Sequence, residues 1–305
     1  MTPPSAMPIP SGWIDLSERA KFRLTGPDRV RYLNGQVTNN VARLGPGDAL
    51  SALVCTAKGR LEAEVVVRAD AECLWLDAPG SLRHSLLARL EKFLIADDCV
   101  WEDVTEQFSL WHGIGAPADS AASATGRIAR FGPPGIDVWL PADSAAPDGP
   151  RLGEFDVEAL RLKWGVPKWG AELTADTLPQ EARLEESAVD FHKGCYVGQE
   201  VVSRLRSVGR VTRLLCRLET VDDSPLAAGD RLFAASAEDG PPVEVGEVTS
   251  AQRDPHLQRT LALGYVKRPA LTPGATFQAG RDKNALFTGV KCRETAPASV
   301  SPSPR

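Results

Sequence analysis

One cysteine stands in a short segment that is rich in chemically useful side chains. The segment runs from Phe191 to Arg204 and reads Phe-His-Lys-Gly-Cys-Tyr-Val-Gly-Gln-Glu-Val-Val-Ser-Arg. Lys193 precedes its cysteine, Cys195, and a helix is expected to begin a few residues after it. A cysteine reacts as its thiolate, and both a nearby cation and a helix N-terminus favour that form. The pattern therefore favours a reactive thiol at Cys195.

A structural role fits part of the same segment. Gly194 and Gly198 can form a tight turn around a buried cysteine, because glycine adopts backbone conformations that other residues avoid. Composition alone does not separate this interpretation from a functional one. The density of polar residues around the cysteine favours function, with Cys195 and Lys193 as catalytic candidates. The accompanying motif residues are Gly194, Tyr196, Gly198, Gln199, Glu200 and Arg204.

The cysteines and histidines of the chain do not suggest a metal site. The six cysteines are far apart and include no Cys-x-x-Cys pair, and the four histidines are scattered. This arrangement is not typical of a zinc ribbon or of a small disulfide framework. We expect most of the cysteines to be small buried apolar residues. They are Cys55, Cys73, Cys99, Cys195, Cys216 and Cys292.

Length and charge narrow the class of protein. A chain of 305 residues is too long for one ordinary core and indicates two or three packed units. The net charge of -5 argues against a nucleic-acid coat, so we expect no direct nucleic-acid partner. The first ten residues lack the basic and apolar regions of a signal peptide, and no apolar run approaches the roughly 18 residues that span a bilayer. We expect a cytoplasmic protein with no membrane contact.

Hydrophobic periodicity predicts the elements that position the cysteine segment. Strands are expected over 21–25, 49–56, 61–67 and 72–77, and helices over 28–33, 81–96 and 154–163. In the helix over 81–96 we expect Ser81 to be the cap. Its expected buried stripe is Leu82, Leu86, Leu87, Leu90, Phe93 and Leu94. After residue 210, five or six short strands separated by glycine and proline turns are enough for a small barrel.

Two further segments have competing interpretations. Gly113 to Ala118 imitates a dinucleotide-binding glycine pattern, but no strand–helix–strand unit surrounds it, so a plain turn is favoured. Asn34 to Asn40 is rich in amide side chains, which donate and accept hydrogen bonds and suit contact with a heterocycle. Turn and cap chemistry is the simpler explanation of these amides, and we favour it on the sequence alone.

The cysteine segment resembles the signature of the YgfZ family, folate-binding relatives of the glycine-cleavage T-protein. The matching residues are Lys193-Gly194-Cys195-Tyr196-Val197-Gly198-Gln199-Glu200, with Arg204 following. Other segments similar to the family occur in the expected order over 32–39, 58–60, 161–167 and 178–182. The resemblance covers roughly residues 13–290.

The resemblance implies an α+β fold with a T-protein-like body around a central cavity, followed by a small C-terminal β-barrel. We accordingly expect a folate-binding region over 12–206, the barrel over 207–294 and a disordered tail over 295–305. It also implies that the cavity binds tetrahydrofolate or another reduced folate. The implied role is in the assembly, repair or maintenance of iron–sulfur clusters, with client enzymes (some of them tRNA-modifying) or assembly proteins as partners. Candidate folate contacts are Asn34, Gln36, Arg60 and Arg161.

Two departures from the T-protein pattern bear on activity. T-proteins carry an acidic pair, including a catalytic aspartate, where this chain has Ala63-Glu64. Alanine is neither acid nor base, and Glu64 would face the opposite side of a strand. Lys163 occupies the place of a pterin-contacting glutamate, and a cation does not accept N–H donors. We therefore expect no classical aminomethyl transfer. A folate-dependent aminomethyltransferase or demethylase and a non-catalytic scaffold remain the alternatives.

Overall fold

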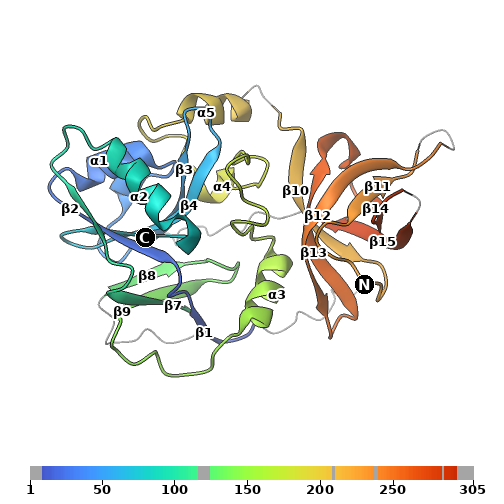
Figure 1. Cartoon of the computed structure of the whole chain (residues 1–305), viewed down its shortest axis with the longest axis horizontal. Helices are drawn as coiled ribbons and strands as arrows, with labels where there is room; N and C mark the ends of the chain where they lie inside the picture. The colour runs from blue at the N-terminus through green and yellow to red at the C-terminus, as the bar shows by residue number, and fades with distance from the viewer. Residues whose placement is uncertain (1–8, 116–123, 208–209, 237–239, 284, 294–305) are drawn as a thin grey trace.

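Two β-sheets and a closed β-barrel make up the chain (Figure 1). The computed structural model describes residues 9–115, 124–207, 210–236, 240–283 and 285–293. The two sheets and their helices form an amino-terminal body, and the barrel follows it. The predicted α+β fold with a C-terminal barrel is therefore confirmed. The expected tail over 295–305 lies outside the described residues, and the domain boundaries stay predictions.

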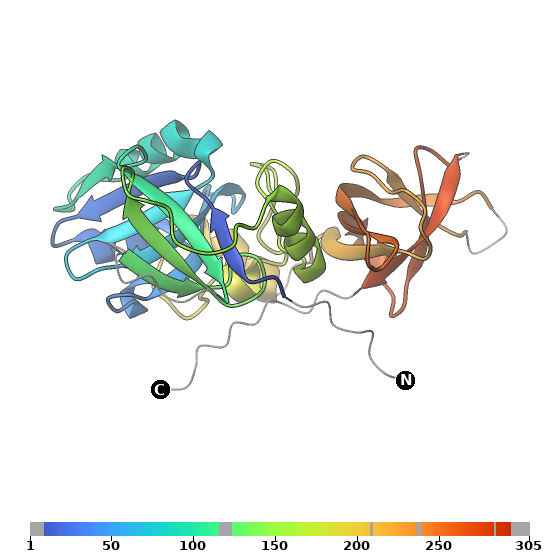
Figure 2. The ribbon, with the colours of Figure 1, turned by 90° about the horizontal axis from the view of Figure 1, so that it is seen from below.

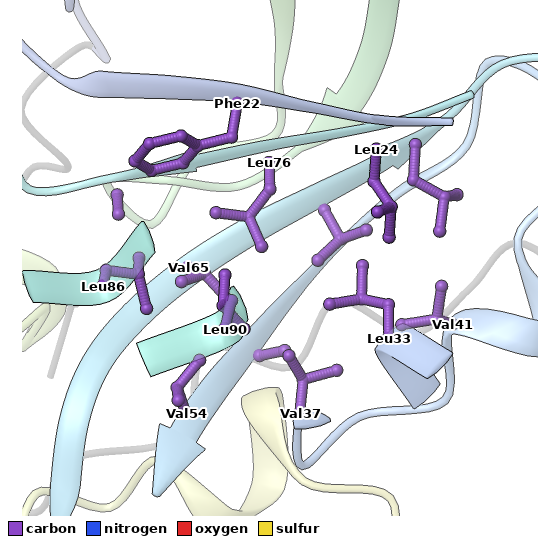
Figure 3. Close-up of a cluster of buried hydrophobic side chains, with 14 of the residues drawn as sticks. Phe22, Leu24, Leu33, Val37, Val41, Val54, Val65, Leu76, Leu86 and Leu90 are labelled. Atoms are coloured by element: carbon purple, nitrogen blue, oxygen red, sulfur yellow. The ribbon is translucent and has the colours of Figure 1, made fainter. Parts of the chain in front are cut away.

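The first sheet has five strands and carries the central core of the body. Its order is β3 (Ala49–Cys55), β4 (Leu61–Ala69), β5 (Leu74–Ala78), β2 (Ala20–Thr25) and β6 (Val100–Asp103). Helices α1 (Arg29–Gln36) and α2 (Arg83–Lys92) cover one face of it. Figure 3 shows Val54 and Val65 of the sheet facing Leu33 of α1 and Leu90 of α2. The short 3-10 turns η1 (Val41–Arg43) and η2 (Gly80–Leu82) lead into neighbouring elements.

Helix α2 is shorter than the sequence pattern predicts. It begins at Arg83, since Ser81 lies in the preceding 3-10 turn and Leu82, not Ser81, occupies the cap position. It ends at Lys92, where the amides of Phe93 and Leu94 bond to carbonyls three residues earlier and tighten the chain. Phe93 is consequently 38% exposed rather than buried, and the Arg89 guanidinium lies 4.0 Å from its ring centre.

The second sheet is antiparallel throughout the described residues. Its order is β1 (Gly12–Asp15), β7 (Phe108–Ile114), β9 (Gly135–Pro141) and β8 (Ala124–Ile128). Gly113 lies in β7, between two antiparallel neighbours. A dinucleotide-binding glycine loop needs a parallel strand–helix–strand unit, so the geometry excludes that interpretation, and Gly113 lies in a strand rather than in the predicted turn. Ala116 to Ala118 of that pattern lie outside the described residues.

A buried chain of opposite charges joins the two sheets. The Arg130 guanidinium contacts Asp77 of β5 at 2.5 Å and Asp137 of β9 at 2.6 Å. Asp137 also contacts the Nδ1 atom of the fully buried His112 on β7 at 2.8 Å. Each carboxylate thus has a charged or hydrogen-bonding partner, as buried ionised groups require. Arg130 thus connects the two sheets by pairing with one carboxylate in each.

We expect the stability of this junction between the sheets to fall at acidic pH. Arg130 and His112 outweigh the cost of burial and hold the pKa of Asp137 at about 2, below its usual 3.8. Because the folded pKa is the lower one, the carboxylate contributes stability that is present above about pH 4 and lost as the pH falls toward 2. We expect a loss of about 2 kcal/mol from this group over that range. Denaturant titrations between pH 5 and pH 2.5 would measure it, and Asp137→Asn should flatten the slope.

The barrel and the connecting segment complete the fold. The strands close in the order β10 (Arg213–Thr220), β13 (Arg259–Lys267), β12 (Val243–Asp254), β11 (Arg231–Ala234), β14 (Thr276–Gly280) and β15 (Leu286–Arg293), with the turn η3 (Arg268–Ala270) after β13. Helix α3 (Glu154–Trp164) lies between body and barrel (Figure 2). After it come α4 (Glu185–Ala188) and α5 (Gln199–Ser207). In the described part of the chain, each helix is too short or too polar to cross a bilayer.

Candidate functional site

A central cavity of about 3000 Å³ lies between the two sheets, α3, α4 and the edge of the barrel. Arg161 of α3 lines it, whereas the other candidate folate contacts do not. The central cavity expected from the family resemblance is therefore present. Folate contact remains a prediction for all four residues, and the structure brings one of them to the cavity wall.

The remaining three candidates bond to the protein itself. The Asn34 side-chain oxygen accepts a hydrogen bond from the Val41 amide at 3.0 Å. The Gln36 side-chain oxygen accepts one from Arg89 at 3.0 Å. Arg60 donates to the backbone carbonyl of Asp176. Asn34 thus bonds within its own loop, as the turn-and-cap interpretation predicts, whereas Gln36 contacts the distant helix α2.

Arg161 is also fully engaged. Its guanidinium is 3% exposed and contacts Glu158 at 2.5 Å and Glu172 at 2.8 Å. Two carboxylates therefore neutralise this cation where it meets the cavity. Lys163, two residues later on α3, is not among the cavity-lining residues. The lysine therefore does not place a cation in the cavity, and its backbone carbonyl accepts a hydrogen bond from Arg217 of the barrel at 2.7 Å.

Glu64 is an acidic cavity residue that the sequence reasoning set aside. Ala63 is fully buried against the helices, and Glu64, one residue further along β4, lines the cavity. Its carboxylate is 30% exposed and lies 3.2 Å from the Arg19 guanidinium. The alternation of the strand is as predicted, but the face toward the cavity is that of residue 64 and not that of residue 63. Alternation alone does not say which face of a strand meets the cavity.

The side chain of Lys193 binds backbone carbonyls at the end of α1. Its ammonium group donates to the carbonyls of Asn34, Val37 and Asn39 at 2.5, 2.7 and 2.7 Å. These carbonyls lie in and just after the last turn of α1. Burial lowers the pKa of Lys193 to about 8. Since all three ammonium donors are used, the side chain fastens the cysteine segment to α1.

Two close approaches fix the other side of the segment. Gly198 has a φ of 87°, and a Cβ atom there would lie 2.5 Å from the Thr56 carbonyl oxygen. Gly59 has a φ of 72°, and its Cβ would lie 3.0 Å from Val201 of α5. Only glycine fits both positions. The Lys58-Gly59-Arg60 turn and the Gly198-Gln199 turn, which are far apart in the sequence, are therefore packed against each other.

Cys195 is exposed, and its neighbours in the motif divide between interior and surface. Tyr196 is 7% exposed and its hydroxyl has no hydrogen-bond partner among the described residues. Gln199 begins α5, whereas Glu200 and Arg204 are exposed on it. Cys195 does not line the central cavity. The structure thus contains two separate candidate sites, a cavity and a surface thiol.

The other cysteines agree with the expected apolar role. Four of the six are buried, Cys292 is half-buried, and all six are free thiols. In the described ranges, no three histidine, cysteine or acidic side chains are grouped so that they could hold a metal ion.

Comparison with known proteins places this geometry in a family. Residues 213–291 match the family model of the glycine cleavage T-protein C-terminal barrel domain. The chain is 28% identical over 260 residues to the tRNA-modifying protein YgfZ of Sodalis glossinidius, covering 75% of this chain and 79% of the relative. It is 26% identical over 230 residues to the iron-sulfur cluster assembly factor IBA57 homolog of Neurospora crassa, covering 67% and 52%.

Two further relatives are aminomethyltransferases. An aminomethyltransferase of Rubrobacter xylanophilus is 30% identical over 294 residues, which covers 84% of this chain and 76% of the relative. The crystal structure of the glycine cleavage system aminomethyltransferase T from Bartonella henselae superimposes with a TM-score of 0.77. It is 19% identical and covers 95% of this chain and 86% of that one, so it supports the fold alone. The chain belongs to the family of glycine cleavage T-protein relatives that includes the YgfZ proteins.

Proposed function

We propose that this protein is a folate-binding accessory factor for the assembly, repair or maintenance of iron–sulfur clusters in client enzymes, with Cys195 as its essential thiol. The observation that carries the proposal is the exposed position of Cys195 on a segment anchored by the buried Lys193 clamp. An anchored but open thiol suits reaction with a group that another protein brings. The names of the YgfZ and IBA57 relatives support the same role.

Folate binding belongs to the cavity in this proposal. A reduced folate presents N–H donors on its pterin ring and carboxylates on its glutamyl tail. The cavity lining includes the Glu64 carboxylate, which accepts hydrogen bonds, and the cations Arg127 and Lys168. The complementarity of these groups supports a reduced folate such as tetrahydrofolate as the ligand.

The thiol and the cavity can be tested separately. In a bacterial strain that lacks its own YgfZ, Cys195→Ser should fail to restore iron–sulfur enzyme activity, whereas Cys292→Ser should restore it. Calorimetry with tetrahydrofolate should give saturable binding for both variants, because Cys195 lies outside the cavity. Full rescue by Cys195→Ser would contradict the role of the thiol. Absence of saturable binding to the unmodified protein would favour the scaffold alternative.

A second candidate function is folate-dependent aminomethyl transfer or demethylation. Glu64 favours it, since the cavity contains an acidic side chain despite the alanine at position 63. The 30% identical aminomethyltransferase favours it as well. It predicts folate-dependent turnover of an aminomethyl-lipoyl carrier or an N-methylated amine, with at least a hundredfold lower rate for Glu64→Gln. No turnover by the unmodified protein would exclude this candidate.

A further inference from the structure

Gly35 and Gly194, near Cys195, occupy positions where the structure of the chain does not require glycine. A Cβ atom added at Gly35 or at Gly194 would meet nothing within 4 Å, and neither residue has a positive φ. Gly35 lies in the last turn of α1, where glycine costs about 0.5–1 kcal/mol relative to alanine. The glycine identity therefore does not serve the fold. It leaves bare backbone on the surface, which suits close approach by another molecule.

Both glycines belong to the surface around the exposed thiol. Gly194 is the immediate neighbour of Cys195. The Gly35 carbonyl accepts a hydrogen bond from the Val197 amide at 3.3 Å, which joins the end of α1 to the cysteine segment. The exposed Gly194 and the half-buried Gly35 therefore lie on the two segments that this hydrogen bond joins.

Three exposed cations lie next to this surface, together with the exposed acids Glu200 and Asp176. Lys58 and Arg60 flank Gly59, whose backbone packs against Gly198, and both side chains are exposed. Arg204 is exposed on α5. Among the described residues neither Lys58 nor Arg204 takes part in an ion pair, and Arg60 reaches only the largely exposed Asp176, at 4.0 Å. Figure 1 shows α5 next to the ends of β3 and β4, where the Lys58–Arg60 turn lies. We call the set Gly35, Lys58, Arg60, Gly194, Cys195 and Arg204 the thiol face.

We infer that the thiol face is the docking surface for a protein partner with an acidic surface, which brings its reactive group to Cys195. Charge complementarity selects an acidic partner, and the bare glycines allow its backbone to approach the thiol closely. A nucleic acid fits less well. The ring of Phe191, the aromatic residue that opens the segment, is covered by the Arg206 guanidinium at 4.1 Å and so does not present an open face for stacking on a base. The inference rests on the proposed function and names the kind of partner that its thiol serves.

Alanine substitution of the two glycines tests the bare backbone. Gly35→Ala should raise the free energy of unfolding slightly, because alanine favours the helix, and Gly194→Ala should leave it unchanged. Both variants should nevertheless lower iron–sulfur rescue in the YgfZ-deficient strain at least fivefold. Stable variants with full rescue would overturn the inference that a partner approaches here, even if Cys195→Ser confirms that the thiol is essential.

Thiol exchange tests the charge without requiring a client. The probes are the anionic disulfide 5,5′-dithiobis(2-nitrobenzoate) and the neutral 2,2′-dithiodipyridine, with Cys195→Ser used to subtract the other thiols. The rate ratio of anionic to neutral reagent at Cys195 should fall at least fivefold in Lys58→Glu/Arg204→Glu and should fall with added salt. The matched control is Arg281→Glu/Lys283→Glu, in the exposed turn between β14 and β15, which should keep the ratio. An unchanged ratio in the thiol-face variant would overturn the electrostatic part.

The class of partner has its own measurement. Fluorescence anisotropy with bulk tRNA in 150 mM salt should show no saturable binding at the thiol face. Binding at this face would be recognised by its loss in the Lys58→Glu/Arg204→Glu variant. Such binding would contradict the inference of an acidic protein partner and would indicate a nucleic-acid partner. Because both in vitro measurements are independent of cluster delivery, a failure of the docking surface can be distinguished from a failure of the proposed function.

Discussion

Replacing Glu172 with alanine should lower the free energy of unfolding by about 3–5 kcal/mol, since the buried Arg161 cation would lose one of its two carboxylate partners and two barrel hydroxyls would lose their acceptor. Glu172 is 1% exposed and lies in the segment between α3 and α4. One carboxylate oxygen accepts from Arg161 at 2.8 Å. The other accepts from the Thr249 and Ser250 hydroxyls of the barrel at 2.7 and 2.6 Å. The residue thus joins the body to the barrel.

Further contacts make Glu172 the centre of this junction. Its first oxygen also accepts the Lys168 amide at 3.0 Å, and its backbone carbonyl accepts the Tyr265 hydroxyl at 2.9 Å. Glutamine in its place would keep the shape, but its NH₂ group would face other donors, so Glu172→Gln should also be destabilising. It should cost less than alanine because it keeps the packing volume.

Urea denaturation of the full chain would measure both variants. Asp176→Ala is the matched control, because Asp176 is an acid in the same segment with a 92% exposed side chain. We expect this control to stay within about 0.5 kcal/mol of the unmodified protein. A loss below about 1 kcal/mol for Glu172→Ala would contradict the view that this carboxylate holds the barrel to the body.

Replacing Lys193 with methionine should cost about 3 kcal/mol, because three carbonyls at the end of α1 would lose a charged donor. The damage should be local. Hydrogen exchange should accelerate at the amides of Asp190 and Val197, which bond to Thr38 and Gly35 across the same junction. Iron–sulfur rescue should fall with it, since the loosened segment no longer presents Cys195 in a fixed place.

This variant also distinguishes a clamp from a catalytic lysine. If Lys193 acted directly on the thiol, methionine would slow the reaction of Cys195 with 2,2′-dithiodipyridine and leave stability unchanged. If it is a clamp, the protein loses stability and the thiol stays reactive toward this small reagent. Lys92→Met, at an exposed lysine of α2, is the control and should change neither property.

Local patterns predicted the cysteine segment, the buried faces of the strands and the terminal barrel, whereas the body around a central cavity was expected from the resemblance to the YgfZ family. Strand alternation at Ala63, Val65 and Val67 and the run of short strands after residue 210 specify buried faces without reference to distant parts of the chain. The boundaries of α2 could not be predicted this way. They depend on the 3-10 turns at both ends, which replace the outer turns of the expected helix. Hydrophobic periodicity does not report where such turns form.

The roles of individual polar residues depended on contacts across the chain. The three carbonyls that hold Lys193 lie more than 150 positions away, at the end of α1. Gln36 and Arg60 are predicted ligand contacts, but in the structure both side chains bond to partners within the protein. Glu64 lines the cavity because the helices cover the other face of β4.

The sequence by itself determined that a cysteine stands in a glycine-bounded segment between an α+β body and a β-barrel, because residue types and hydrophobic periods are local properties. Only the tertiary structure decided that Lys193 is a clamp and that Cys195 opens to the surface, away from the cavity. Hydrogen-bond partners and exposure are set by segments distant in sequence, and no local pattern contains them.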